Sequence, residues 1–366
     1  SKYINELSNE KELHPESYIE RPEKKSSIDY IPLKNINERV VTRINLFFHE
    51  TLKSDKNLIF IGEDVLSPYG GAFKVANNLS EEYPDNVIST PISEGAITGM
   101  ANGLSLSGFR PYLEIMFGDF ITLALDQIIN HASKYYHMYN KQVTCPIVIR
   151  TPMGGGRGYG PTHSQTMDKF LVGIDNVTVI ALNSLVDPKL IYRNIHDNEK
   201  HPVLVIENKI DYGRFVGVTE IGYYSLSQST DSYPVVKCSP EIDEPSLTLV
   251  TYGGISQDVI DNIHNIFRRT DLVPEVIILS RISPLNISSV IDSVNKTKRI
   301  IAIEEGGKEF GIGAEIIAQV VENIDIDLIA IGRIGALPVP IPSSQSLEDC
   351  VLPNTTLVDD IYRELS

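Results

Sequence analysis

Short, continuous apolar runs that alternate with helix-period segments constrain the fold of this chain more than any other feature. Runs rich in Ile and Val occur at 57–62, 146–150, 177–181 and 203–207. Helical patterns lie between them, at 40–52, 93–106, 120–136 and 186–196. Strands that are apolar throughout are typical of parallel sheets covered on both faces. The pattern therefore predicts an α/β domain with a mostly parallel sheet.

A second, smaller block repeats this alternation. Its expected strands are 247–252, 275–279, 299–304 and 327–332, and its expected helices are 255–267, 287–294, 312–321 and 358–365. The fold class is thus α/β, with two α/β domains and mostly parallel sheets. We expect a charged N-terminal extension or linker at 1–39, a first domain at 40–222, a polar interdomain linker at 223–244 and a second domain at 245–366.

Composition narrows the range of partners. The 366 residues, 42% of them hydrophobic, suffice for two domain cores. The 32 basic and 48 acidic residues give a net charge of −16, so we do not expect nucleic acid to bind. No run approaches about 18 apolar residues, so no membrane span is expected. Three separated cysteines favour a cytoplasmic location, or an organelle matrix if a leader was removed.

Two glycine-rich segments carry polar side chains that are candidates for chemistry. The segment 90–103 (TPISEGAITGMANG) places Ser93 as a helix N-cap and Glu94 in the first turn. That carboxylate either complements the helix dipole or faces a ligand. The segment 151–165 (TPMGGGRGYGPTHSQ) has five glycines in seven residues and ends near His163, which either caps the loop or acts in catalysis. The neighbouring Ser164 lacks the GxSxG elbow of a hydrolase.

Other familiar signatures are missing from the sequence. No GxGxxG follows a strand, and neither GxxxxGK[ST] nor HExxH occurs. The sequence therefore lacks the usual motifs for nicotinamide binding, for P-loop phosphate binding and for zinc-dependent hydrolysis.

Several ordered segments carry a resemblance to a known family. TPISEGAITGMANGLSLSGFRPYLEIMFGDF, LDQIINHASKYY and GPTHSQ resemble the β subunit of 2-oxoacid dehydrogenase E1 components, of the pyruvate, branched-chain and acetoin type. The likeness continues through RISPLNISSVIDSVNKTKRIIAIEEGGKEFGIGAEI and PVPIP. It implies a thiamin-diphosphate-binding, transketolase-like fold, with a pyrimidine-binding domain followed by a transketolase C-terminal domain.

The resemblance implies a divided cofactor site. In this family the E1 α subunit holds Mg²⁺ and the diphosphate of thiamin diphosphate through a GDG segment, which this chain lacks. The partners implied are an α subunit in an α₂β₂ assembly or a fused α domain, the lipoyl acyltransferase E2, and a 2-oxo acid substrate. The activity implied is oxidative decarboxylation and acyl transfer to lipoyl-E2, and only with the α partner.

Site roles follow from the same resemblance. Glu94 matches the glutamate that hydrogen-bonds the pyrimidine nitrogen N1′, and His163 matches a histidine that orients the substrate carboxylate and assists acyl transfer. Phe120 matches an aromatic residue packed on the aminopyrimidine, and Ile92 matches a residue lining that ring. Glu63 matches a carboxylate of the acidic channel between two thiamin sites. For Phe120, Ile92 and Glu63, a purely structural role as core side chains or a strand-end carboxylate stays open.

A structural K⁺ site is also implied by the family. Ile147, Asn194, Ile195 and Asp197 match its ligand positions. The turn HDNEKHP is two residues longer than usual, and Glu199 stands where an asparagine is expected.

Two other functions remain open. The chain is an alternative candidate for the C-terminal half of a split transketolase or deoxyxylulose phosphate synthase, although PISEGAITG and GPTHSQ fit the E1 β subunit better. It is also a candidate for a noncatalytic interaction subunit that keeps the same fold.

Overall fold

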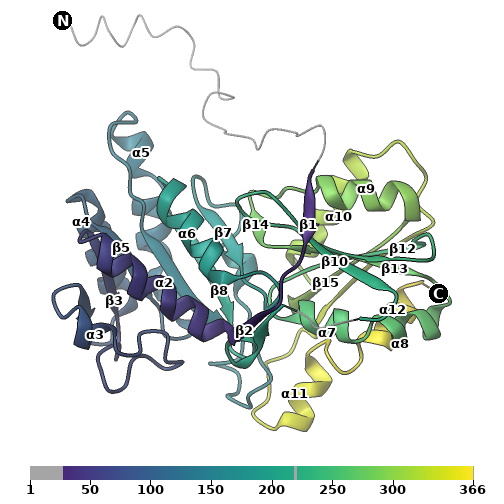
Figure 1. Ribbon diagram of the computed structural model, residues 1–366, viewed down its shortest axis with the longest axis horizontal. Helices are drawn as coiled ribbons and strands as arrows, with labels where there is room; N and C mark the ends of the chain where they lie inside the picture. Colours follow the sequence, from purple (N-terminus) through teal and green to yellow (C-terminus); the bar gives the residue numbers. More distant parts are fainter. Residues whose placement is uncertain (1–27, 218–220, 366) are drawn as a thin grey trace, which may run out of the picture.

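Two α/β domains lie side by side in the computed structural model, which describes residues 28–217 and 221–365 (Figure 1). Each domain is built around a seven-stranded sheet. The predicted architecture of two α/β domains is confirmed. None of the helices within the described ranges is both long and apolar enough to span a bilayer.

The sheet of the first domain is almost entirely parallel. Its strands are β3 (Leu58–Gly62), β4 (Val87–Ser89), β5 (Arg110–Glu114), β6 (Val148–Met153), β7 (Thr178–Ala181) and β8 (Val203–Asn208). The seventh strand, β14 (Arg281–Ser283), comes from the second domain and pairs antiparallel with β7. The order is β14-β7-β8-β6-β5-β3-β4. Every residue of β3 and β6 is buried, as expected for strands covered on both faces.

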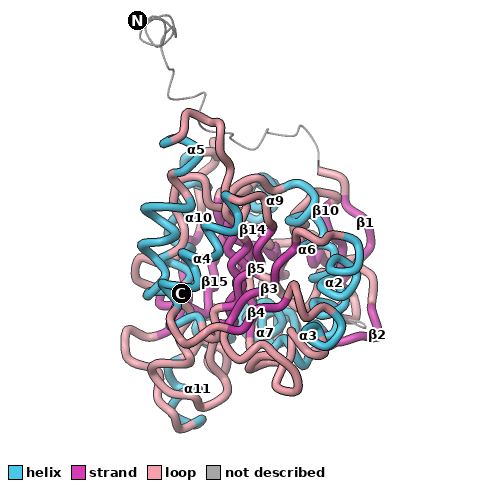
Figure 2. Tube along the Cα trace, turned by 90° about the vertical axis from the view of Figure 1, so that its left-hand side faces the viewer, coloured by secondary structure: helices cyan, strands magenta, loops and turns pink. Residues whose placement is uncertain are grey.

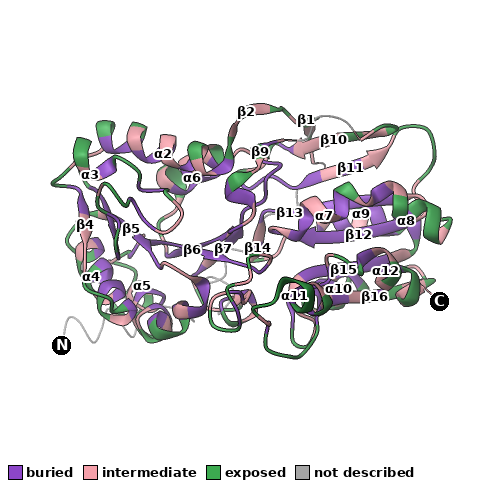
Figure 3. Cartoon of the chain, turned by 90° about the horizontal axis from the view of Figure 1, so that it is seen from below, coloured by how far each residue is buried: buried purple, intermediate pink, exposed green. Residues whose placement is uncertain are grey.

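Helices cover both faces of this sheet (Figures 2 and 3). On one face lie α2 (Val40–Ser54) and α6 (Pro188–Asn198), and on the other lies α4 (Glu94–Leu106). Short helices occur at α3 (Leu79–Glu82) and α5 (Tyr135–Met138). Asp187 caps α6 by accepting from the Lys189 N–H, and Pro188 occupies the first turn.

The continuous helix expected at 120–136 is divided into different helical types. It consists of the 3₁₀-helix η2 (Gly118–Ala124), the π-helix η3 (Gln127–Ala132) and α5. The Asn102 side chain of α4 donates to the Gln127 carbonyl at 3.0 Å. A helix carbonyl that accepts from a neighbouring helix favours a local departure from α-geometry.

The second domain has a mixed sheet. Its order is β1-β10-β11-β13-β12-β15-β16, and the strands are β1 (Tyr30–Pro32), β10 (Tyr224–Ser229), β11 (Val236–Pro240), β12 (Leu247–Tyr252), β13 (Pro274–Leu279), β15 (Arg299–Gly307) and β16 (Ala330–Ala336). The pairs joining β13, β12, β15 and β16 are parallel, and the remaining pairs are antiparallel. The helices are α7 (Ile255–Asp261), α8 (Ile263–Thr270), α9 (Ser288–Thr297), α10 (Ile312–Glu322), α11 (Gln345–Val351) and α12 (Leu357–Leu365).

Two expected connecting segments instead contribute strands. The interdomain linker expected at 223–244 contains β10 and β11 of the second sheet. In the extension expected at 1–39, residues 1–27 lie outside the described residues, but β1 pairs with β10 and β2 (Ile36–Arg39) pairs with β9 (Phe215–Val216). Residues on β1 and β10 are mostly half-buried or exposed. Such strands near a sheet edge carry polar residues and therefore resemble linkers in sequence.

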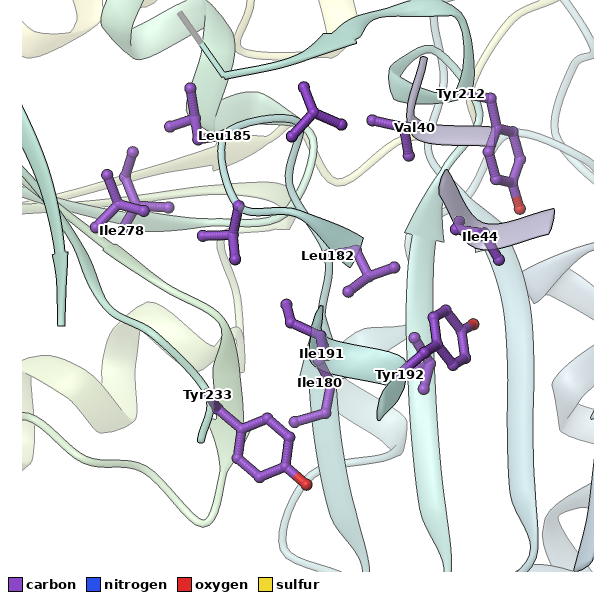
Figure 4. Packing of buried hydrophobic residues seen from close by; sticks show 14 of the residues in the cluster. Val40, Ile44, Ile180, Leu182, Leu185, Ile191, Tyr192, Tyr212, Tyr233 and Ile278 are labelled. Carbon is purple, nitrogen blue, oxygen red and sulfur yellow. The ribbon is translucent and has the colours of Figure 1, made fainter. Parts of the chain in front are cut away.

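One hydrophobic cluster spans both domains. Leu182, Leu185 and Ile191 of the first domain belong to the same buried cluster as Tyr233 and Ile278 of the second (Figure 4). A second buried cluster also contains residues from both domains. The interface between the domains is therefore part of the buried hydrophobic core, not a solvent-filled gap between two separate cores.

Candidate cofactor and substrate site

The residues matched to the thiamin site lie on segments that follow the carboxyl ends of strands in the first parallel sheet. Glu63 directly follows β3, Glu94 begins α4 after β4, and the glycine-rich loop follows β6. In open α/β sheets, ligands bind in the crevice outside the carboxyl ends of the strands. The topology therefore places these segments where ligand chemistry is expected.

Two buried carboxylates lie together at the start of α4. Glu63 is 3% exposed and Glu94 is 5% exposed. Glu63 Oε1 accepts from the Ser93 N–H at 2.9 Å, so the predicted N-cap position is held by a carboxylate from the neighbouring strand. Burial raises the pKa of Glu63, the Ser93 N–H opposes this rise, and the nearby Glu94 charge adds to it.

The Glu94 side chain is mostly buried, and its carboxylate has no hydrogen-bond donor among the described residues. Within residues 28–217 and 221–365, no group forms a hydrogen bond with its side chain. Buried polar groups are normally hydrogen-bonded, so this carboxylate suits a donor supplied by a ligand. Ile92, two residues earlier, is 76% exposed. The structure therefore does not bury Ile92 in the core of this chain.

Aromatic rings surround His163, at the end of the glycine-rich loop. The His163 ring meets Phe117 with centroids 4.8 Å apart and Phe120 with centroids 5.1 Å apart, both edge to face. Its Nδ1 lies 2.9 Å from Thr162 Oγ1. Helix α4 packs against η2, which carries Phe120. The structure thus brings Phe120 and His163 into contact and places their segment beside the helix that begins with Glu94.

Three further residues at this site were not identified from sequence. Phe117 contacts the His163 ring, and the Lys209 ammonium donates to the His163 carbonyl at 2.5 Å and lies over the Phe117 ring. Asp119 accepts from the Gln165 side chain at 2.8 Å. The sequence offered one indication that Lys209 lies at the site. Lys209 directly follows strand β8, and ligands bind near the carboxyl ends of such strands.

Burial alters the electrostatics of Lys209. Its side chain is fully buried, and this burial lowers the pKa of its ammonium to about 8, while the Asp119 and Glu305 carboxylates oppose the change. A cation with this pKa lies directly behind the candidate histidine. It stabilises the backbone of His163 rather than its ring.

Of the residues matched to a K⁺ site, Asn194, Ile195 and Asp197 lie at the end of α6. Ile147 directly precedes β6, and its carbonyl accepts from the Val203 N–H at 2.9 Å. The Ile195 and Glu199 carbonyls accept from the Arg110 guanidinium at 2.7 and 2.8 Å. The Asn194 side chain donates to the Ser232 carbonyl, and Asp197 is exposed. Two carbonyls at this helix end thus already face a cation of the protein. A potassium ion there stays a prediction.

The described residues fit one half of thiamin diphosphate better than the other. Glu94 and the aromatic rings provide a buried acceptor and flat apolar surfaces, which suit an aminopyrimidine ring. Across the described ranges, no group of three or more His, Cys, Asp or Glu residues could hold a metal ion. The fit of Glu94 and the aromatic rings concerns the pyrimidine half of the cofactor.

Comparisons with protein families divide the chain into two matched regions. Residues 40–214 match the family described as transketolase, pyrimidine binding domain. Residues 237–358 match the family described as transketolase, C-terminal domain. The second match begins within β11, in agreement with the strands found in the expected linker.

Similar proteins cover nearly the whole chain. The mitochondrial pyruvate dehydrogenase E1 component subunit beta of Saccharomyces cerevisiae is 30% identical over 96% of this chain and 94% of its own length. The corresponding subunit of Rickettsia bellii is 34% identical over 83% of this chain and 91% of its own. A solved structure described as a split-gene transketolase, inactive β4 tetramer, has a TM-score of 0.66 and 15% identity, covering 89% of this chain and 97% of that chain. This last likeness concerns the fold alone.

Proposed function

Because this chain belongs to the family of 2-oxoacid dehydrogenase E1 β subunits, we propose that it supplies the pyrimidine half of a thiamin diphosphate site shared with an α subunit. The observation that carries this proposal is the buried Glu94 carboxylate, which has no hydrogen-bond donor among the described residues. When bound, thiamin diphosphate supplies the carbon nucleophile and the electron sink for decarboxylation of a 2-oxo acid.

Glu94 acts on the proton of a ring nitrogen. Its position at the first turn of α4 fixes the carboxylate on a rigid element. Low solvent exposure strengthens a hydrogen bond between this carboxylate and a ring nitrogen donor. The neighbouring Glu63 adds negative charge, which favours sharing of a proton in this corner of the site.

Phe120 and His163 act on the ring and the substrate. The Phe120 ring provides an apolar wall for a flat heterocycle and limits the entry of water. The His163 imidazole, half-buried at this wall, donates a hydrogen bond to the carboxylate of a 2-oxo acid and later assists acyl transfer to the lipoyl group. Pyruvate is the first substrate to test, because the similar proteins are named pyruvate dehydrogenase subunits.

The proposed partners are an α subunit and the lipoyl acyltransferase E2. Ile92 and Leu123 are 76% and 61% exposed beside the site. Exposed apolar side chains around a polar centre suit burial by another subunit. The proposed α subunit contributes the GDG segment, the contacts to the diphosphate and the bound Mg²⁺.

The test is reconstitution of decarboxylation with a GDG-bearing α subunit. The isolated chain should not decarboxylate pyruvate with thiamin diphosphate, Mg²⁺ and a dye acceptor, and the mixed subunits should. Glu94→Gln should lower kcat of the complex by about 10²-fold or more, because it removes the group that accepts the ring proton.

Glu81→Gln, an exposed carboxylate on α3 of the same domain, is the matched control and should leave the rate unchanged. Equal rates for Glu94→Gln and wild type would favour a noncatalytic role. Ketol transfer from a sugar phosphate, without decarboxylation of 2-oxo acids, would favour the transketolase alternative.

A further inference from the structure

The backbone amides of the glycine-rich loop are bound by carboxylates of the second domain. Gly155 N–H donates to Glu305 Oε1 at 2.8 Å. Gly156 and Gly158 N–H groups donate to the two oxygens of Glu348 at 2.9 and 3.0 Å. Convergent amides of such a loop form a concave anion site. Here the anion comes from the protein itself.

The loop conformation that aims these amides requires glycine. Gly154, Gly156, Gly158 and Gly160 all have φ between 67° and 92°. Residues other than glycine rarely adopt such positive φ values. Glycine-rich segments of this kind are flexible on their own. The hydrogen bonds to Glu305 and Glu348 hold this loop in one conformation.

Glu348 belongs to α11, and its side chain is fully buried against the loop. Its side chain is 0% exposed. A Cβ built on Gly155 would lie 2.8 Å from Glu348 Oε1 and 2.5 Å from Leu352 Cδ1. A Cβ built on Gly158 would lie 2.9 Å from the Ser343 carbonyl. The segment around α11 thus packs directly against the loop backbone, with no space for a side chain between them.

The same loop leads directly to His163. The His163 N–H donates to the Gly160 carbonyl at 3.2 Å, so the histidine belongs to the turn that ends the loop. Its ring touches Phe117 and Phe120. A change in the path of Gly156 and Gly158 would therefore be transmitted through the turn to the position of the imidazole.

We propose that Glu348 of the second domain is a positioning residue for His163, acting through the two loop amides that its carboxylate binds. This inference rests on the proposed function, in which the His163 imidazole faces the substrate. It gives the second domain a direct part in the site of the first. Glu305, bound to the adjacent amide, supports the same loop.

The variant Glu348→Gln tests the role of both oxygens with little change in size. Its amide oxygen keeps one acceptor, but its NH₂ group would face a loop N–H and cannot accept from it. In the reconstituted complex we expect kcat to fall by about tenfold to a hundredfold, since small misplacements of a reacting group have effects of this size. Glu322→Gln, at the exposed end of α10, is the matched control.

A double-mutant cycle with His163→Ala separates positioning from general stability. If Glu348 acts through His163, Glu348→Gln should lower the rate of wild type but not further lower the rate of the His163→Ala complex. Equal fold losses in both backgrounds would overturn the proposal. If Glu348→Gln does not fold, Glu348→Asp keeps the charge, shortens the side chain, and enters the same cycle.

A measurement without turnover keeps this proposal separate from the proposed function. The rate at which diethyl pyrocarbonate modifies His163, followed by mass spectrometry on the full chain, reports the environment of the imidazole. Glu348→Gln should change this rate several-fold, and Glu322→Gln should not. Unchanged modification of His163 would overturn the positioning role, whereas failure of the wild-type complex to decarboxylate any 2-oxo acid would overturn the proposed function alone.

Discussion

The most unusual single side chain of the site is the buried ammonium of Lys209. It donates to the His163 carbonyl and also lies over the Phe117 ring. Burial lowers its pKa in the folded protein to about 8, from 10.5 for an ordinary lysine. Between these two values the unfolded chain binds a proton that the folded chain does not, so stability rises with pH in that range.

Replacement of Lys209 by methionine should remove this pH dependence. Between pH 8.0 and 9.5, the free energy of unfolding of wild type should rise by about 1–2 kcal/mol relative to that of Lys209→Met. Denaturant unfolding at the two pH values measures the difference. Lys296→Met, an exposed residue near the end of α9, should show no such change. A constant difference between wild type and Lys209→Met would contradict the low pKa.

At this scale, the sequence indicates candidate residues only where they belong to a local pattern. Glu94 and His163 stand in glycine-rich segments that make them candidates, and their roles stay predictions; the structure buries the first and surrounds the second with aromatic rings. Glu348 has no such signal, because its loop partners lie far away along the chain and α11 resembles an ordinary polar surface helix. Only the folded backbone reveals its burial.

At the scale of elements, the central strands β5, β6 and β8 carry buried charges: Glu114 and Glu207 near the carboxyl ends of β5 and β8, and Arg150 within β6. Arg150 of β6 forms ion pairs with Glu114 of β5 and Glu207 of β8. The Tyr192 and Tyr212 hydroxyls also donate to Glu207. A buried charge is tolerated only when it is paired and hydrogen-bonded. The three strands are therefore joined by side chains as well as by their backbone ladder.

Arg150→Met should be strongly destabilising. It leaves two buried carboxylates without their cation, for which losses of about 3–5 kcal/mol are typical. Arg363→Met, which removes the exposed pair with Asp360 on α12, should cost less than about 1 kcal/mol. Chemical denaturation of both variants provides the comparison. Similar losses for the two would contradict a dominant role for the buried network.

Elements were predictable where apolar periodicity is strong and unpredictable at sheet edges. Strands β3, β6 and β8 lie close to the ranges expected from their continuous apolar runs. Strand β10 reads as a polar segment because most of its residues are only half-buried. Its pairing with β1 joins parts of the chain separated by the whole first domain. No local pattern contains that information.

At the scale of the whole molecule, polar contacts join the two domains across their shared core. The Tyr252 hydroxyl of β12 donates to Asp168 of the first domain at 2.7 Å and to Glu304 of β15 at 3.1 Å. Burial raises the pKa of Asp168 and raises the pKa of Glu304 to about 7. The contribution of Glu304 to the free energy of unfolding is thus fully present below its unfolded pKa near 4.5. That contribution is lost as the pH rises through about 7.

Tyr252→Phe should weaken the whole chain rather than one domain. It removes the donor shared by two buried carboxylates, and losses of about 1–3 kcal/mol are typical for buried groups left unpaired. Because the two largest hydrophobic clusters each contain residues of the two domains, calorimetry should show one transition that moves to lower temperature. Tyr223→Phe, at a 70% exposed side chain, serves as the control. Two separate transitions, with only one moved, would contradict a common core.

The strand β1 has a consequence for the order in which the protein matures. It precedes the first domain along the chain, yet its hydrogen-bonding partner β10 follows that domain. During synthesis β1 cannot pair with β10 until the whole first domain and β10 itself have been made. The edge strand β1 of the second sheet is therefore the earliest described segment of the chain, but its pairing forms late in biogenesis.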